Sequence, residues 1–236
     1  MQTISTSAWL HPVGMSGADN VYTLLRENLL AGLHCSFGSD LQVTGTVMLE
    51  DFVTIHKSAS LYGFLYIERD VQIGEYSQVG MHSEKNTALS AEFTWVRSGA
   101  RIGHHSQIAG GVIIGEGAWL EPFSQADCDV PAGAQAGGSP LILRGYLCSR
   151  CGSLLSAPVR QPESCTAEIS SGAGLNPRLV EQAEQQIQLI CRVCGYPHLF
   201  TTQQWRWVGR ELPLPGEHRQ ADKLATPAGL RRFMQW

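Results

Sequence analysis

The sequence contains no apolar run of about 18 residues, the length at which a membrane-spanning helix is predicted, so we expect no membrane span. Its first residues, MQTISTSAWL, lack a basic stretch followed by an apolar segment, and they do not resemble a secretory signal. The net charge of −4 in 236 residues gives no excess of positive charge, so we expect no nucleic-acid partner.

Cysteine is present in an odd number, seven, which does not suit a framework of disulfide bonds. Four of the cysteines form two CxxCG motifs, Cys148 to Gly152 and Cys191 to Gly195. Zinc binds four thiolates in tetrahedral geometry, and each CxxC turn supplies two of them. We predict a closed, structural Zn²⁺ site without a catalytic role, whose ligands are Cys148, Cys151, Cys191 and Cys194.

Two reduced or redox-active dithiols are the alternative interpretation of these motifs. Either way the thiols are reduced, which predicts a cytoplasmic protein. Cys165 lies between the motifs and is expected to be a spare thiol, whereas Cys35 and Cys128 are expected to be small buried residues.

The middle of the chain carries a six-residue repeat of aliphatic side chains. A period of six fits neither a single helix nor a single strand, but it is typical of a parallel β-helix in which each sextet is one short strand and a turn. Three sextets make one triangular coil, and fourteen sextets predict between four and five coils. The repeated positions are Phe37, Val43, Leu49, Ile55, Leu61, Ile67, Ile73 and Val79, and then Val96, Ile102, Ile108, Ile114, Leu120 and Ala126.

The repeat is interrupted between Val79 and Val96, which are 17 positions apart where the period requires 12 or 18. The intervening segment is polar at its start and aromatic at its end. Functional residues are often found where a chain leaves a regular scaffold, and this segment begins with His82. A tolerated insertion is the alternative.

The flanking segments predict helices. Ser16 can cap a helix that ends at Gly32 and covers the open first coil, and Asn176 with Pro177 can begin a second helix between the two cysteine motifs. The apolar stripes of these helices are Val21, Leu24, Leu25 and Leu29, and Leu179, Val180, Ala183, Ile187 and Ile190.

We therefore expect a mainly β fold, a parallel β-helix with an N-terminal helix and a C-terminal α+β zinc module. The predicted parts are an N-terminal segment, residues 1–34, a β-helix domain, residues 35–146, and a zinc-ribbon-like module with a tail, residues 147–236.

Residues 35–146 resemble the left-handed β-helix hexapeptide-repeat superfamily. The resemblance rests on the sextets, on the excursion after Val79 and on the ending, in which Val130-Pro131-Ala132-Gly133 leads to Gly138-Ser139-Pro140-Leu141-Ile142-Leu143-Arg144. It implies a left-handed coil and a homotrimer whose sites lie between protomers. It does not fix the activity, because the fold supports several chemistries.

One branch of this superfamily comprises acyl-CoA-dependent acyltransferases, in which a histidine near the start of an excursion acts as general base. The resemblance implies this role for His82, with acetyl-CoA as the simplest donor and a hydroxyl or amine of a small molecule as acceptor. Imidazole has an ordinary pKa of about 6.5, so its neutral form can accept a proton near neutral pH. Glu84 would orient His82 or bind the acceptor. The alternative is that His82 is a polar loop residue.

A second branch comprises the gamma-class carbonic anhydrases, whose zinc is held by three histidines. His104 in Gly103-His104 matches the first of these, but Ala109 stands where the second is expected, and His82 matches the third only loosely. His105 is expected to point to the opposite side of its strand. We therefore expect no three-histidine zinc site, and we keep His104 as a candidate catalytic residue of an acyl-transfer site. A gamma-carbonic-anhydrase-like protein, active or degenerate, is one alternative function, and a non-catalytic scaffold that docks through the zinc module is another.

Overall fold

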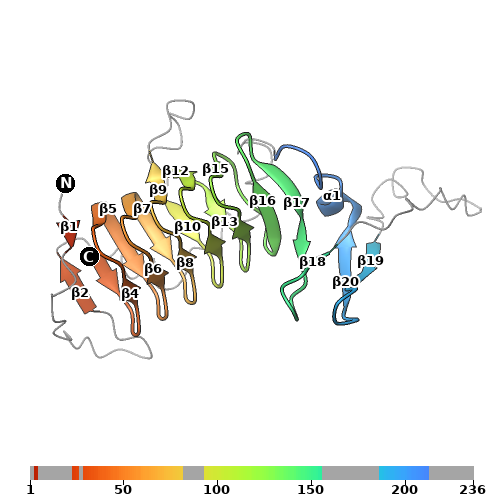
Figure 1. Ribbon diagram of the computed structural model, residues 1–236, viewed down its shortest axis with the longest axis horizontal. Coiled ribbons are helices and arrows are strands. Elements are labelled where there is room, and N and C mark those ends of the chain that lie inside the picture. Colours follow the sequence, from red (N-terminus) through yellow and green to blue (C-terminus); the bar gives the residue numbers. More distant parts are fainter. Residues whose placement is uncertain (1–2, 5–22, 27–28, 82–92, 156–185, 213–236) are drawn as a thin grey trace, which may run out of the picture.

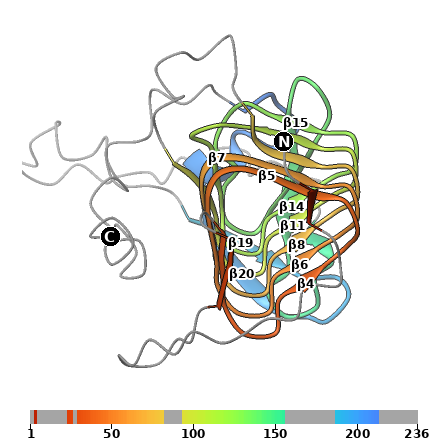
Figure 2. The same cartoon turned by 90° about the vertical axis from the view of Figure 1, so that its left-hand side faces the viewer.

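The structure, a computed structural model, describes residues 3–4, 23–26, 29–81, 93–155 and 186–212. These residues form an elongated solenoid of stacked coils that ends in two β-hairpins (Figure 1). Viewed along the solenoid axis, successive coils superimpose (Figure 2). No helix in this part of the chain is long and apolar enough to cross a membrane.

Two sheets form the walls of the solenoid, and their coil-to-coil strand pairs are parallel. One sheet contains β1 (Thr3–Ile4), β2 (Thr23–Arg26), β3 (Leu29–Ala31), β5 (Leu41–Leu49), β7 (Ser60–Ile67), β9 (Gln78–Met81), β10 (Thr94–Val96), β12 (Gln107–Ala109), β13 (Ile113–Ile114) and β15 (Gln125–Ala126). The other contains β4 (Ser36–Phe37), β6 (Thr54–Ile55), β8 (Gln72–Ile73), β11 (Arg101–Ile102), β14 (Trp119–Leu120), β16 (Ala134–Gly137), β17 (Ile142–Leu147) and β18 (Leu154–Leu155).

The side chains of the six-residue repeat fill the interior of the solenoid. All of them except Phe37 are buried, and Phe37 is partly buried against the same core. Partners on neighbouring coils are three sextets apart, as in the pairing of Val43 with Leu61 and of Leu61 with Val79. The predicted β-helix of hexapeptide repeats is thus confirmed.

The repeat continues in register across the excursion. Ile67 pairs with Val96, and Val79 pairs with Ile108. In each of these pairs, the two residues are separated along the chain by three sextets plus one further segment. The length of that segment equals the length of residues 82–92. The interval between Val79 and Val96 is therefore one sextet plus this insertion, which explains why it is not a multiple of six. Residues 82–92 lie outside the described part of the chain.

The predicted N-terminal helix is wrong where the structure describes it. Leu24 lies on β2 and Leu29 on β3, and β3 pairs in parallel with β5 through Leu29 and Val47. The first coil exposes unpaired backbone groups at its edge, and pairing with that edge satisfies more hydrogen bonds than an isolated short helix would. Ser16 and Val21 lie outside the described residues.

The second predicted helix is wrong at its C-terminal end for a related reason. Ile187 and Ile190 lie on β19 (Gln186–Ile190), which forms an antiparallel hairpin with β20 (Pro197–Thr201). The cysteine turn at the tip of this hairpin favours strand pairing over helix formation. The rest of the predicted helix lies outside the described residues. A single short helix, α1 (Thr202–Trp205), follows β20 among the residues described.

β17 joins the solenoid to the cysteine hairpins. It pairs antiparallel with β16 of the last coil and with β18 beyond the first cysteine turn. The chain after α1 returns to the same strand, where Leu143 N donates to Arg210 O (3.0 Å) and Leu212 N to Leu141 O (3.1 Å). The predicted boundary between residues 146 and 147 falls within β17.

Candidate functional sites

The two CxxCG motifs form the same tight turn at the tips of neighbouring hairpins. Gly152 N donates to Cys148 O (2.8 Å), and Gly195 N donates to Cys191 O (2.9 Å). Both glycines have positive φ, 71° and 70°, a conformation that side chains disfavour. The glycine after each second cysteine is therefore what closes each turn.

The four predicted ligands converge on one point. Their Sγ atoms all lie within 4.8 Å of one another, and the Cys148–Cys194 and Cys151–Cys191 sulfur pairs are each 3.6 Å apart. Four sulfurs at about 2.3 Å from a tetrahedral zinc would be separated by about 3.8 Å. The donor set and its spacing fit a structural zinc ion. Among the described residues, this is the one group of three or more His, Cys, Asp or Glu side chains that lie close enough together to hold a metal.

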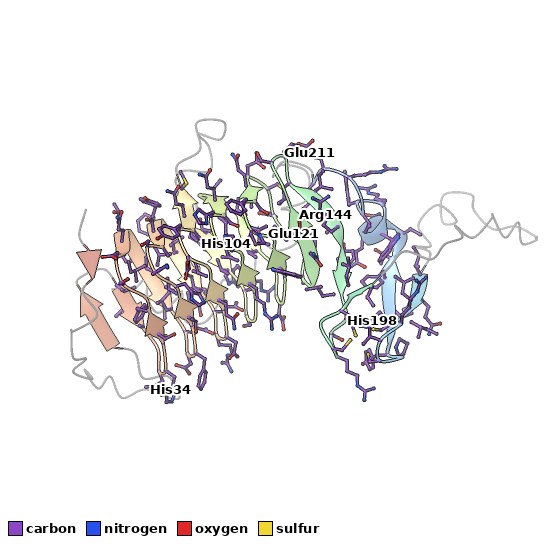
Figure 3. All side chains as sticks on the ribbon, viewed as in Figure 1. His34, His104, Glu121, Arg144, His198 and Glu211 are labelled. Atoms are coloured by element: carbon purple, nitrogen blue, oxygen red, sulfur yellow. The ribbon has the colours of Figure 1, made fainter. Side chains whose placement is uncertain are left out.

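Two residues that the sequence motif does not include contact the thiols. Ser153 Oγ lies 3.1 Å from Cys191 Sγ, and this hydrogen bond, with backbone N–H groups, lowers the pKa of Cys191 to about 6. His198 Nε2 lies 3.2 Å from Cys148 Sγ, and Figure 3 shows the ring beside the cluster of sulfur atoms. Both can donate hydrogen bonds to thiolates, which stabilises the form that binds metal.

The cysteine site belongs to the same buried core as the solenoid. Cys148 and Cys191 are buried and pack within the core cluster that includes the aliphatic repeat. Tyr146 on β17 packs against Phe200, with ring centroids 4.9 Å apart and the ring planes tilted by 36°, and its hydroxyl donates to Gln204 O (3.1 Å). The hairpins therefore cover the C-terminal end of the solenoid.

The second candidate site is a corner of the solenoid that carries two histidines. His104 and His105 form a turn between β11 and β12, and His105 has a φ of 57°. Their Nδ1 atoms are 3.1 Å apart, and both side chains are exposed. The expectation that His105 points away from His104 is wrong, because side chains alternate sides along a strand and these residues lie in a left-handed turn.

His105 is part of a stack of rings along this corner. The Tyr76 and Phe123 rings lie on either side of it, each with its centroid 5.0 Å from that of His105 and with interplanar angles of 29° and 23°. His104 meets Phe123 edge-on at 4.9 Å. Sequence reasoning missed this arrangement, although the three stacked residues occupy equivalent places in successive coils.

The catalytic residues predicted for the excursion, His82 and Glu84, lie outside the described residues. The last described residue before them is Met81, whose carbonyl oxygen accepts a hydrogen bond from Gly110 N (2.7 Å). The excursion therefore starts beside Ala109, at the far end of β12 from His104. At the strand rise of about 3.3 Å per residue, the five steps from His104 to Ala109 span at most about 16 Å.

Ala109 is the position at which gamma-class carbonic anhydrases are expected to carry a second histidine. Its methyl group offers no metal ligand, and it pairs with Met81 on the preceding coil. The part of the chain that the structure describes contains no set of three histidines close enough to share a metal. His82, the loosest match to that family, lies outside it.

The fold and the two sites together define a parallel β-helix of hexapeptide repeats that is capped by a four-cysteine module suited to a metal. No family model matches the sequence, and no curated protein matches it either.

Solved structures with some similarity are acyltransferases. The acetyltransferase domain of PglB from Neisseria gonorrhoeae, in complex with acetyl coenzyme A, is 16% identical over 50% of this chain and 54% of its own, with a TM-score of 0.37. A hexapeptide-repeat acetyltransferase from Vibrio cholerae is 18% identical over 48% of this chain and 70% of its own (TM-score 0.36). A variant of the N-acyltransferase AntD from Bacillus cereus, in complex with dTDP and coenzyme A, is 17% identical over 49% of this chain and 79% of its own (TM-score 0.37). The matched part of this chain thus spans about half the length of the PglB domain.

Proposed function

We propose that this protein is an acyltransferase that moves an acyl group, most simply acetyl, from an acyl-CoA to a hydroxyl or amine of a small molecule. The observation that carries the proposal is the insertion in the solenoid. One coil is longer than its neighbours by the length of the excursion, while the repeat positions on both sides still pair between coils, Ile67 with Val96 and Val79 with Ile108. An insertion that leaves the scaffold intact, and that begins with a histidine, suits a site built on a rigid support.

His82 would be the general base, and Glu84 would orient it or bind the acceptor. Neutral imidazole takes the proton of the acceptor as the acceptor attacks the thioester carbonyl. Backbone amides of the coils would stabilise the oxyanion, and the proton would then pass to the departing CoA thiolate.

We further propose a homotrimer with sites between protomers. Within one chain, His104 and the start of the excursion lie at opposite ends of β12. In the proposed trimer the sites lie between protomers, and His104 would contribute to the same site as an excursion.

The proposed role of the four-cysteine centre is structural, with Zn²⁺ bound by Cys148, Cys151, Cys191 and Cys194. Four protein ligands fill a tetrahedral site and leave no position for substrate.

The test is to incubate the tag-free, zinc-loaded protein with a panel of acyl-CoA donors, and to follow thermal stability and release of free CoA with candidate acceptors. His82→Ala should slow transfer by about 10²–10⁴-fold. His56→Ala, at an exposed histidine more than two coils before His104, is the matched control and should transfer at the wild-type rate. No thermal shift with any donor would contradict the proposal.

A docking function for the zinc module is the second candidate, and one observation favours it. Ile190, Val193 and Leu199 are 65%, 75% and 66% exposed. Ile190 and Leu199 lie on the two paired strands of the β19–β20 hairpin, and Val193 lies at its tip. Apolar side chains gathered in this way are typical of protein-interaction surfaces.

A further inference from the structure

We propose that His105 is a positioning residue for His104. In this arrangement Nδ1–H of His104 donates a hydrogen bond to Nδ1 of His105, which leaves Nε2 of His104 as its unprotonated nitrogen. The catalytic consequence rests on the proposed acyl transfer, whereas the pairing rests on geometry alone.

The pairing follows from the distance between the two rings. A neutral imidazole has one N–H and one bare nitrogen, and the Nδ1 atoms of His104 and His105 are 3.1 Å apart. Two bare nitrogens at that distance would repel each other, so one of them must carry a proton. The rings are nearly perpendicular, at 85°, with centroids 5.3 Å apart, so that one ring meets the other edge-on.

The ring of His105 is held in place by its neighbours. Tyr76 and Phe123 stack on its two faces, and rotating the ring out of the stack would lose both contacts. Phe123 also contacts the ring of His104. Gly74, in the preceding coil, fixes the backbone here, because a Cβ at that position would lie 2.5 Å from His104 N.

The stack is not required by the fold. Tyr76 and Phe123 have φ of 56° and 60°, a conformation that costs a bulky residue about 1–2 kcal/mol. The same corner of the earlier coils carries Asp40 and Ser58, which also have positive φ (60° and 55°), so the left-handed turn does not need a ring. The two rings are also 47% and 67% exposed, so they contribute little to the core. Aromatic rings at a corner where other coils carry small polar side chains indicate a local role, and holding the ring of His105 is the role that the contacts show.

The consequence for acyl transfer is a defined orientation of the acceptor. An O–H or N–H of the acceptor that does not itself react donates a hydrogen bond to the unprotonated Nε2 of His104, whose Nδ1–H stays donated to His105. The general base of the proposed function takes the proton of the reacting O–H or N–H while the acceptor atom bonds to the acyl carbon. The carbon–sulfur bond then breaks, and that proton passes to the CoA thiolate, so that the products are an ester or amide and free CoA.

Two variants separate the hydrogen bond from the stack. His105→Phe retains an aromatic ring between Tyr76 and Phe123 but has no acceptor. His105→Asn loses the ring but retains an acceptor oxygen, and asparagine tolerates the left-handed turn. ¹⁵N NMR of the histidine rings in the zinc-loaded protein reports the tautomer of His104 directly.

We expect His104 to carry its proton on Nδ1 in the wild type and in His105→Asn, and to shift towards the Nε2–H form in His105→Phe. Acyl transfer should fall by about 10- to 100-fold in His105→Phe and stay within a few-fold of wild type in His105→Asn. A wild-type His104 in the Nε2–H form, or a tautomer that is the same in His105→Phe, overturns the pairing.

The activity measurements distinguish failure of this inference from failure of the proposed function. If the wild type transfers no acyl group, the proposed function fails, and the NMR measurement still decides the pairing. If the wild type is active and His104→Ala is equally active, acyl transfer stands and the positioning role is wrong.

Discussion

At the scale of single residues, the close stacking of coils leaves no room for side chains at certain corners. A Cβ at Gly74 would lie 2.5 Å from His104 N and 2.8 Å from Gly103 C, both of them backbone atoms of the next coil. We expect Gly74→Ala to lower the free energy of unfolding by about 1–3 kcal/mol, because the coils must move apart. Urea denaturation monitored by circular dichroism measures this loss.

Gly110→Ala is the matched control for this substitution. The nearest atom to a Cβ at Gly110 is Met81 O at 3.4 Å, an ordinary contact distance. Equal destabilisation by both substitutions would show that the cost comes from losing glycine and not from the spacing of the coils.

Cys128 is expected to make the free energy of unfolding depend on pH in the alkaline range. Burial, followed by the charges of Asp127, Asp129 and Glu211, raises the pKa of this thiol from 9.0 to about 12. Between these values the unfolded chain loses the proton and the folded protein keeps it, so the free energy of unfolding falls as pH rises. The contribution is at most about 1.4 kcal/mol per pH unit.

Unfolding measured in urea at intervals from pH 8 to pH 11 tests this expectation. Cys128→Ala should lower stability throughout, through the small cavity that it leaves, but should show a shallower decline above pH 9. Tyr146, whose pKa burial raises to about 12, contributes equally in both proteins. An identical slope for the two proteins would contradict the assignment to Cys128.

At the scale of secondary-structure elements, the cysteine turns are expected to depend on metal. We expect one zinc per chain in the wild type and none in Cys148→Ser, with loss of the β17–β18 and β19–β20 hairpins and a destabilisation of several kcal/mol. Elemental analysis measures the metal, and the fluorescence of Trp205 and Trp207 reports the packing of the module.

Cys35→Ser serves as the control for the zinc prediction. Cys35 Sγ lies 3.0 Å from Glu50 O in the solenoid, a contact that a serine hydroxyl can reproduce. This variant should retain its zinc and its stability. A wild-type protein that purifies without stoichiometric zinc, even from zinc-supplemented medium, would favour the dithiol alternative.

Some of these secondary-structure elements can be predicted from the sequence, and others cannot. The repeat around Ile55, Ile73 and Leu120 is periodic and buried, so period alone identified the coils and their interior. The four cysteines were identified because zinc ligation fixes residue type and spacing. The segments near Leu24 and Ile187 were predicted as helices because an apolar stripe does not reveal that a strand edge lies nearby.

The histidine corner was beyond prediction for a different reason. Whether the side chain of His105 points towards His104 or away from it depends on the backbone conformation of the turn. Side chains alternate between two sides only along a strand, so that rule does not apply here. The ring contacts of Tyr76 and Phe123 with His105 arise between coils, from residues far apart in the chain. The separation of Tyr76 from His105 includes the excursion, which obscured the period.

At the scale of the whole molecule, the solenoid should tolerate removal of the excursion. Deleting residues 82–92 joins Met81 to Phe93 and restores that coil to three sextets, while the pairs of β7 with β9 and with β10 stay in place. We expect a melting temperature within a few degrees of wild type, one zinc per chain and no acyl transfer. Calorimetry and the CoA-release assay measure these outcomes, and retained transfer would place the reaction elsewhere.

The position of β17 has a consequence for how the protein is made. This strand closes the last coil and leads directly into the first cysteine turn, and the ligands from Cys148 to Cys194 follow every coil in the chain. During synthesis the coils emerge first and stack with an open terminal edge, which is prone to pair with other chains. Metal can hold the final strand in place only after the second turn has left the ribosome. Scarcity of zinc during translation would therefore act on chains whose solenoid is already complete, and would leave them exposed to aggregation.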